Sequence, residues 1–147
     1  MIDLIKKNAL YLAWTGSLVG MLGSLYFSEI ANYPPCVLCW YQRIAMYPLV
    51  VIIGFAIYKK SRDMLLPAFV LAAIGWIIGL YHNLLYYEIL PEAAAPCIAG
   101  VSCTTKFIEW FGFVTIPLLA FAGFTGVLIL LVIHWKATKP QKEVNNV

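Results

Sequence analysis

The stretch Cys36-Val37-Leu38-Cys39-Trp40-Tyr41-Gln42-Arg43 determines how the rest of the chain is interpreted. It places two thiols three residues apart, where the turn Tyr33-Pro34-Pro35 meets a hydrophobic segment. In a helix, Cys36, Cys39 and Arg43 lie within roughly 60° of one another on one face, and Arg43 is about 6 Å deeper than Cys39. The sequence therefore predicts two thiols and a cation along one face at the start of a helix.

The composition indicates a membrane protein. Of the 147 residues, 63% are hydrophobic and 12% are charged, whereas soluble domains carry about 25% charged residues. A single soluble domain could not bury so many apolar side chains, and they occur in blocks rather than with an amphipathic period. We therefore expect lipid to surround the outer faces of the fold.

Four hydrophobic blocks are long enough to cross a bilayer, which takes about 20 helical residues. They cover about residues 9–29, 40–58, 64–87 and 111–135. The first is too long for a cleaved signal peptide and lacks a small-residue cleavage site, so we expect it to be retained. The predicted fold is an all-α membrane protein, a four-helix bundle forming a single domain over residues 1–147. A short interfacial helix is expected at 107–111, in the second outer loop.

The basic residues predict the orientation of this bundle. Eight of the ten Lys and Arg residues fall at one end of the predicted spans, near the termini and the 59–63 turn. These residues are Lys6, Lys7, Lys59, Lys60, Arg62, Lys136, Lys139 and Lys142. The positive-inside rule places this end, with both termini, in the cytoplasm. The topology accounts for the net charge of +3, so we expect no nucleic-acid partner.

All four cysteines fall in or beside the two loops at the other end of the bundle. An extracytoplasmic environment favours disulfides, whereas cytosolic thiols are kept reduced. At Cys36 and Cys39, a helix N-terminus and a nearby cation both favour the reactive thiolate. We interpret this C-x-x-C pair as redox-active; a structural disulfide and half of a metal site are the alternatives.

Arg43 is a candidate ligand-binding residue because a charge inside a membrane segment is costly and usually faces a partner or cavity. A guanidinium can hydrogen-bond a carbonyl oxygen of a lipid-soluble ligand and stabilise the anion formed on its reduction. Alternatively, Arg43 extends to the lipid headgroups. His82, expected at the same depth on the third span, is either a second ligand contact and proton carrier or an interface residue with no such role.

Small residues share one face of the first span, at Gly16, Gly20, Gly23 and Ser24. Small side chains at this spacing let another helix approach closely. We interpret this face as a packing surface only.

A second cysteine pair, Cys97 and Cys103, precedes the fourth span, with Gly100 midway between them. Two dithiol pairs on one side permit electrons to pass by thiol–disulfide exchange from an outside donor, through both pairs, to a membrane acceptor. A four-cysteine zinc site is disfavoured, because that side is oxidising and the Cys97–Cys103 spacing is wider than usual for zinc. We therefore expect no metal.

These residues resemble the DsbB family of disulfide-bond-formation membrane proteins, and the short loop pair resembles its BdbC branch. The resemblance covers nearly the whole chain. It includes the four spans, the C-x-x-C-x-x-Q-R motif opening the second, a His-Asn near the outer end of the third, and a cysteine pair before the fourth. In the vitamin K epoxide reductase family the C-x-x-C lies on the last span of the four-helix core instead.

The resemblance implies quinone-dependent generation of disulfide bonds, with ubiquinone or menaquinone as the electron acceptor. It implies that a reduced, DsbA-like extracytoplasmic thiol oxidase attacks Cys97, with Cys103 as the resolving cysteine. The alternatives are a non-catalytic membrane assembly subunit with two static disulfides and a reductase of extracytoplasmic disulfides.

The resemblance also implies a division of roles at the second span. Cys39 is the cysteine that meets the quinone, and Cys36 is its partner in the motif. Arg43 and His82 are then the quinone-side arginine and the third-span histidine near the quinone.

Overall fold

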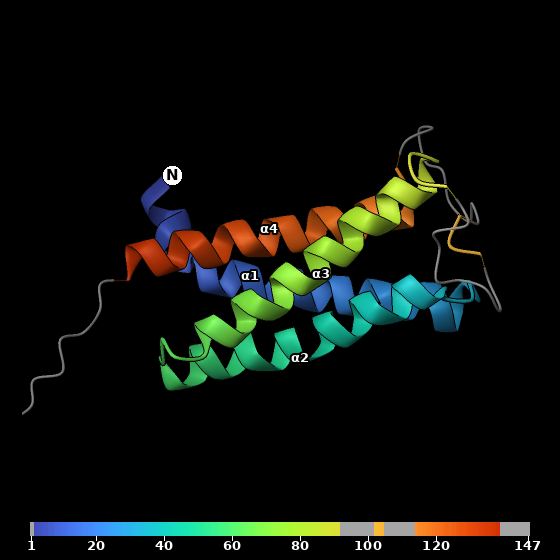
Figure 1. Ribbon diagram of the computed structural model, residues 1–147. Coiled ribbons are helices and arrows are strands. Elements are labelled where there is room, and N and C mark those ends of the chain that lie inside the picture. Colours follow the sequence, from blue (N-terminus) through green and yellow to red (C-terminus); the bar gives the residue numbers. More distant parts are fainter. Residues whose placement is uncertain (1, 92–101, 105–113, 139–147) are drawn as a thin grey trace, which may run out of the picture.

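The structure is a bundle of long helices (Figure 1). The computed structural model describes residues 2–91, 102–104 and 114–138. Its helices are α1 (Ile2–Leu25), the π-helical turn η1 (Tyr26–Ile30) that continues it, α2 (Val37–Lys59), α3 (Leu65–Tyr86) and α4 (Ile116–Ala137). The predicted all-α fold is confirmed.

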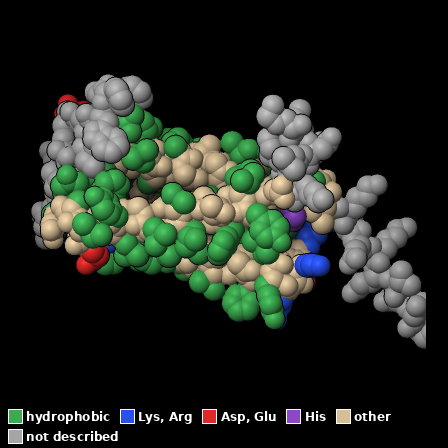
Figure 2. All heavy atoms as spheres, turned by 180° about the vertical axis from the view of Figure 1, so that it is seen from behind, with side chains coloured by type: hydrophobic (Ala, Val, Ile, Leu, Met, Phe, Trp, Pro, Cys, Tyr) green, Lys and Arg blue, Asp and Glu red, His purple; other side chains and the backbone are tan. Residues whose placement is uncertain are grey.

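Within the described part of the chain, four helical segments are long and apolar enough to cross a membrane, as predicted. They are Asn8–Ile30, Val37–Lys59, Leu65–Tyr86 and Ile116–Ala137. Figure 2 shows apolar side chains along the middle of one face, with Lys and Arg near one end and acidic residues near the other. Large apolar side chains such as Val19, Ile44 and Ile77 are more than half exposed, as expected where lipid is the solvent.

The helices differ from the predicted spans mainly at their starts. Helix α2 begins at Val37 rather than 40 because Cys36 caps its N-terminus. Helix α4 begins at Ile116 rather than 111, since Thr115 is extended and its Oγ1 accepts a hydrogen bond from the backbone N–H of Leu118 at 3.3 Å. The predicted interfacial helix at 107–111 lies outside the described residues.

Each helix packs against two neighbours: α1 and α3 both contact α2 and α4. The buried core lies where these contacts meet and includes Leu49, Ile53, Ala72, Phe124 and Leu131. Small residues allow the helices to approach, and large side chains fill the space that remains.

The bundle has two distinct ends (Figure 1). The N-terminus, the α2–α3 turn and the end of α4 lie together at one end, where Arg62 donates to the carbonyl oxygen of Trp135 at 3.3 Å and lies over its ring. Cys36 and Cys103 belong to the other end, where the η1–α2 segment meets the chain preceding α4. The described cysteines therefore lie far from the basic end.

Gly75 tests this packing, because a Cβ there would overlap the ring of the buried Phe124. We expect Gly75→Ala to lower the free energy of unfolding in detergent by about 1–3 kcal/mol, the usual cost of overpacking. Gly126→Ala is the control, since a Cβ at Gly126 meets nothing within 4 Å. Equal stability of the two variants would show that Phe124 does not fill this space.

Candidate functional site

The C-x-x-C pair forms the start of α2, as predicted. Cys36 is the N-cap, with an extended backbone, and its Sγ accepts a hydrogen bond from the backbone N–H of Cys39 at 3.3 Å. The two Sγ atoms lie 2.9 Å apart, and both cysteines are free. The first turn of a helix has unpaired N–H groups, so this position stabilises a thiolate.

The surroundings of Cys36 lower the pKa of its thiol to about 4, well below the ordinary value. The hydrogen bond with the Cys39 side chain is the largest cause, and His82, whose Nε2 lies 3.8 Å from Cys36 Sγ, adds to it. Burial opposes both effects. The sequence suggested Arg43 as the basic group that acts on this pair, but the basic side chain in contact with Cys36 is His82.

Cys103 lies beside the pair, in a buried cluster with Cys36, Leu38 and Leu85. Its carbonyl oxygen is 3.2 Å from His82 Nε2. Cys103 is disulfide-bonded, and its partner lies outside the described residues. The predicted loop cysteine Cys97 also lies outside them. The structure thus brings Cys103 of the second pair into contact with the first pair's cluster.

His82 lies level with Cys36, not with Arg43 as the sequence suggested. It is one turn before the end of α3, whereas Arg43 is almost two turns into α2. His82 is therefore placed at the thiols, and only 2% of its surface is exposed.

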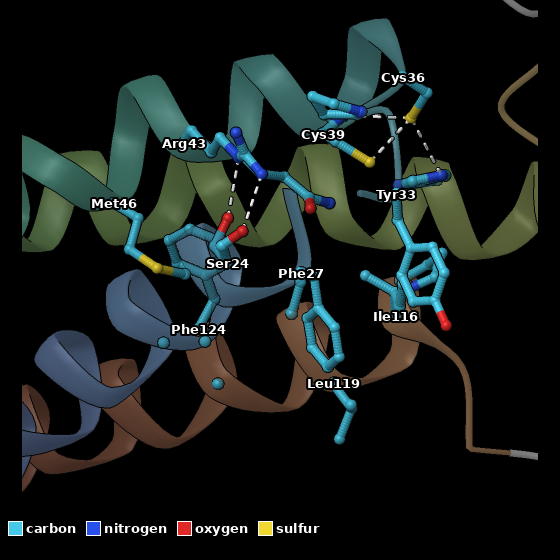
Figure 3. Close-up of a pocket in the computed structure, with 18 of the residues that line it drawn as sticks. Ser24, Phe27, Tyr33, Cys36, Cys39, Arg43, Met46, Ile116, Leu119 and Phe124 are labelled. Carbon is cyan, nitrogen blue, oxygen red and sulfur yellow. Dashed lines mark hydrogen bonds between the residues drawn. The ribbon is translucent and has the colours of Figure 1, made fainter. Parts of the chain in front are cut away.

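Arg43 is buried and directed into the bundle, toward α1 (Figure 3). Its Nε donates to Ser24 Oγ at 2.8 Å and its Nη2 to the Ser24 carbonyl oxygen at 2.9 Å. The guanidinium also lies 5.3 Å from the centre of the Trp40 ring. No carboxylate of the described residues pairs with it. This inward direction argues against the alternative that Arg43 extends to the headgroups.

The contact of Ser24 with Arg43 is a feature of the site that the sequence interpretation missed. The small face of α1 does pack, since a Cβ at Gly20 would meet Met46, but the same face also lines a cavity. The sequence did contain a signal for this contact, because Ser24 places a hydroxyl among glycines at the level of Arg43 on another span. The sequence interpreted this face as packing only; in the structure it also bonds Arg43 and forms a wall of the cavity.

A cavity of about 380 Å³ connects these groups. Cys39, Arg43, Gln42 and His82 line it together with apolar residues from all four helices. Figure 3 shows Cys39 and Arg43 on one side, with Phe27 and Leu119 across from them. Mostly apolar walls with a few polar groups are typical of small-molecule sites, which span roughly 300–1,000 Å³.

Two polar atoms at this cavity lack partners among the described residues. Gln42 Nε2 and His82 Nδ1 are buried without a hydrogen bond. Buried polar groups are nearly always paired. Together with the unpaired guanidinium charge of Arg43, they suit an apolar ligand with polar oxygens on its head group, such as a quinone.

Cys36, Cys39 and His82 also bring three possible metal-ligand atoms within 4.8 Å of one another. The Sγ–Sγ distance of 2.9 Å suits a thiol–thiolate hydrogen bond, whereas two thiolates on one zinc lie roughly 3.8 Å apart, given Zn–S bonds of about 2.3 Å. A four-cysteine zinc site does not fit, because Cys103 is disulfide-bonded.

Comparisons with known proteins show a relation to disulfide formation proteins. The family model of "Disulfide bond formation protein DsbB" matches residues 6–135. The chain is 47% identical over 124 residues to the "Probable disulfide formation protein C 1" of Bacillus anthracis, covering 84% of this chain and 89% of that protein. It is 44% identical to the "Disulfide bond formation protein C" of Bacillus subtilis, covering 83% and 88%. No solved structure matches.

The pKa of Cys36 predicts its reactivity. We expect its alkylation by iodoacetamide to be nearly independent of pH in the neutral range and to slow only as the pH falls toward 4, because the thiolate persists above its pKa. Mass spectrometry of the reduced protein at each pH measures the rate at Cys36. In Cys39→Ala, which lacks the largest lowering effect, the profile should move to higher pH. A wild-type rate that climbs until about pH 8.5, as for an ordinary thiol, would contradict the assignment.

Proposed function

The chain belongs to the DsbB family of disulfide bond formation proteins, and from this premise we propose that it re-oxidises a DsbA-like thiol oxidase and passes the electrons to a membrane quinone. Membership of the family makes it a thiol-disulfide oxidoreductase that generates disulfides. The observation that carries the quinone proposal is the shared cavity. It joins the free dithiol Cys36–Cys39 to a buried Arg43 that has no carboxylate partner among the described residues.

Electrons enter at the loop pair. The dithiol of the reduced partner attacks the disulfide that we propose between Cys97 and Cys103, and leaves as a disulfide. Cys97 is the remaining candidate for the bond to Cys103, because Cys36 and Cys39 are free. The loop pair then holds two electrons and two protons as two thiols.

Exchange with the C-x-x-C pair follows. The loop dithiol attacks the Cys36–Cys39 disulfide, which becomes a dithiol while the loop disulfide re-forms. Cys103 and Cys36 share one buried cluster, which supports exchange without a long movement. A free C-x-x-C beside a bonded Cys103 corresponds to the stage at which this exchange is complete.

The last transfer oxidises the Cys36–Cys39 dithiol. Cys36 and Cys39 return to a disulfide as two electrons and two protons leave, and a bound quinone supplies the two-electron acceptor that forms quinol. Arg43 orients a carbonyl oxygen of the acceptor and stabilises negative charge there. His82, in contact with Cys36 Sγ, takes the thiol proton when Cys36 ionises after the exchange and gives it up as the disulfide forms.

The two ends of the helix bundle support a location in the cell membrane with the thiols outside the cytoplasm. The described cysteines lie at the end of the bundle opposite the start of α1 and the end of α4. With the basic end in the cytoplasm by the positive-inside rule, the chain is a multi-pass domain of the cell membrane whose thiols face the oxidising side. A secreted partner can reach them there.

The alternative of an assembly subunit with two static disulfides has less support. A free pair with one stabilised thiolate is what a reactive dithiol requires and what a static disulfide lacks. The reverse flow, reduction of outside disulfides, would need an electron-donor site at the basic end.

An anaerobic assay tests the electron route. Reduced protein, freed of reductant and mixed with a stoichiometric short-chain quinone, should lose two thiols for each quinol formed. We expect Cys39→Ser to abolish quinol formation. Cys97→Ser should block oxidation of the partner but still reduce quinone through Cys36 and Cys39.

Two outcomes would contradict this route. Partner oxidation by Cys97→Ser at the wild-type rate would show that the loop pair is not the entry point. Thiols that persist with quinone and disappear only in air would favour the static-disulfide alternative.

Arg43 provides a separate test of quinone binding. We expect Arg43→Ala or Arg43→His to raise the KM for quinone about tenfold to a hundredfold, since a hydrogen bond to a charged group contributes about 1.5–3 kcal/mol. The control is Arg62→Ala, which removes an arginine that also bonds a carbonyl oxygen and lies over a tryptophan, at the other end of the bundle. An unchanged KM in the Arg43 variants, with normal folding, would remove Arg43 from the site.

A further inference from the structure

Gln42 is a buried polar residue to which the mechanism above assigns no role. It is 6% exposed, and its Nε2 has no hydrogen-bond partner among the described residues. It follows Cys39 by three positions and precedes Arg43 by one, so the three side chains project from adjacent parts of one helix face. All three line the same cavity.

The fold leaves room for this amide but provides no polar partner. A Cβ at Gly79 of α3 would lie 3.5 Å from Gln42 Nε2 and 3.4 Å from Cα of Phe121 on α4. The amide therefore lies where α2, α3 and α4 approach one another. No described residue accepts a hydrogen bond from Gln42 Nε2.

Asn83 shows what a structural amide looks like in the same bundle. Its Nδ2 donates to the carbonyl oxygens of Gly79 at 2.8 Å and Pro117 at 3.0 Å, which joins α3 to the start of α4. Gln42 makes no such bond, although it lies next to the same glycine. Because the Gln42 amide joins no helices but lines a cavity of ligand size, its position suits a contact with a ligand.

We propose that Gln42 is the second head-group contact of the quinone site and that its amide binds both redox forms; this rests on the function proposed above. The NH₂ group donates to a carbonyl oxygen of the quinone. The two ends of an amide have the same size, so the group can turn over and accept a hydroxyl proton of the quinol with its oxygen. Arg43 has only donors and cannot make this second bond.

The test measures binding without turnover. In a Cys36→Ser/Cys39→Ser parent protein, tryptophan fluorescence quenching in detergent under anaerobic conditions gives the Kd of a short-chain quinone and of its quinol. We expect Gln42→Leu to raise both values about three- to tenfold, the effect of losing one net hydrogen bond. The thermal unfolding midpoint of the ligand-free protein should stay the same or rise, because an unpaired buried donor is removed.

Tyr47→Phe is the matched control. Tyr47 is also on α2, and its hydroxyl is likewise buried without a partner, but it does not line the cavity. Removing this hydroxyl should leave both Kd values unchanged. Gln42→Met, which keeps the length of the side chain without its donor, repeats the test if Gln42→Leu does not fold.

The possible outcomes separate this inference from the proposed function. Unchanged Kd values in Gln42→Leu or Gln42→Met, with Arg43→Ala weakened, would overturn the role of Gln42 alone. A fall in the ligand-free unfolding midpoint in both Gln42 variants would assign the amide a structural role instead. A parent protein that binds neither form would overturn both the quinone site and this inference.

Discussion

The bond from Arg43 to Ser24 is the contact on which the site depends. A guanidinium among apolar helices is costly, and the usual remedy, a carboxylate partner, is absent among the described residues. The hydroxyl and carbonyl of Ser24 satisfy part of the guanidinium without neutralising its charge. Arg43 therefore stays in place and keeps a positive potential directed at the cavity, which is what an acceptor that gains electrons requires. The glycines around Ser24 keep that space open.

The sequence predicted the helices better than the relations between them. Hydropathy identifies four spans because each helix must be apolar along its own length. It is less informative at helix starts, where Thr115 and Cys36 act through local capping bonds. It does not define how far one helix slides along another, so His82 was expected near Arg43 but lies beside Cys36.

The site residues divide in the same way. Cys36, Cys39 and Arg43 belong to one helix, and their common face followed from helical geometry alone. The roles of Ser24 and Gln42 depend on other helices. Ser24 accepts a hydrogen bond from Arg43 on α2, and no described residue of a neighbouring helix provides a hydrogen-bond partner for Gln42 Nε2. A pattern within one segment cannot report a contact, or a missing contact, between segments.

Cys36 links the fold to the direction of electron flow. As the N-cap of α2 it accepts the backbone N–H of Cys39, and as a thiolate it accepts this bond more strongly than a disulfide sulfur would. The cap, the Cys39 thiol and His82 therefore stabilise the reduced pair selectively. A pair whose reduced form is stabilised is the stronger oxidant in its disulfide form. Such a pair draws electrons readily from the loop cysteines but gives them up reluctantly. Transfer from this pair therefore needs an acceptor whose reduction is favoured by its surroundings. The positive charge of Arg43, held in place by Ser24, favours that reduction.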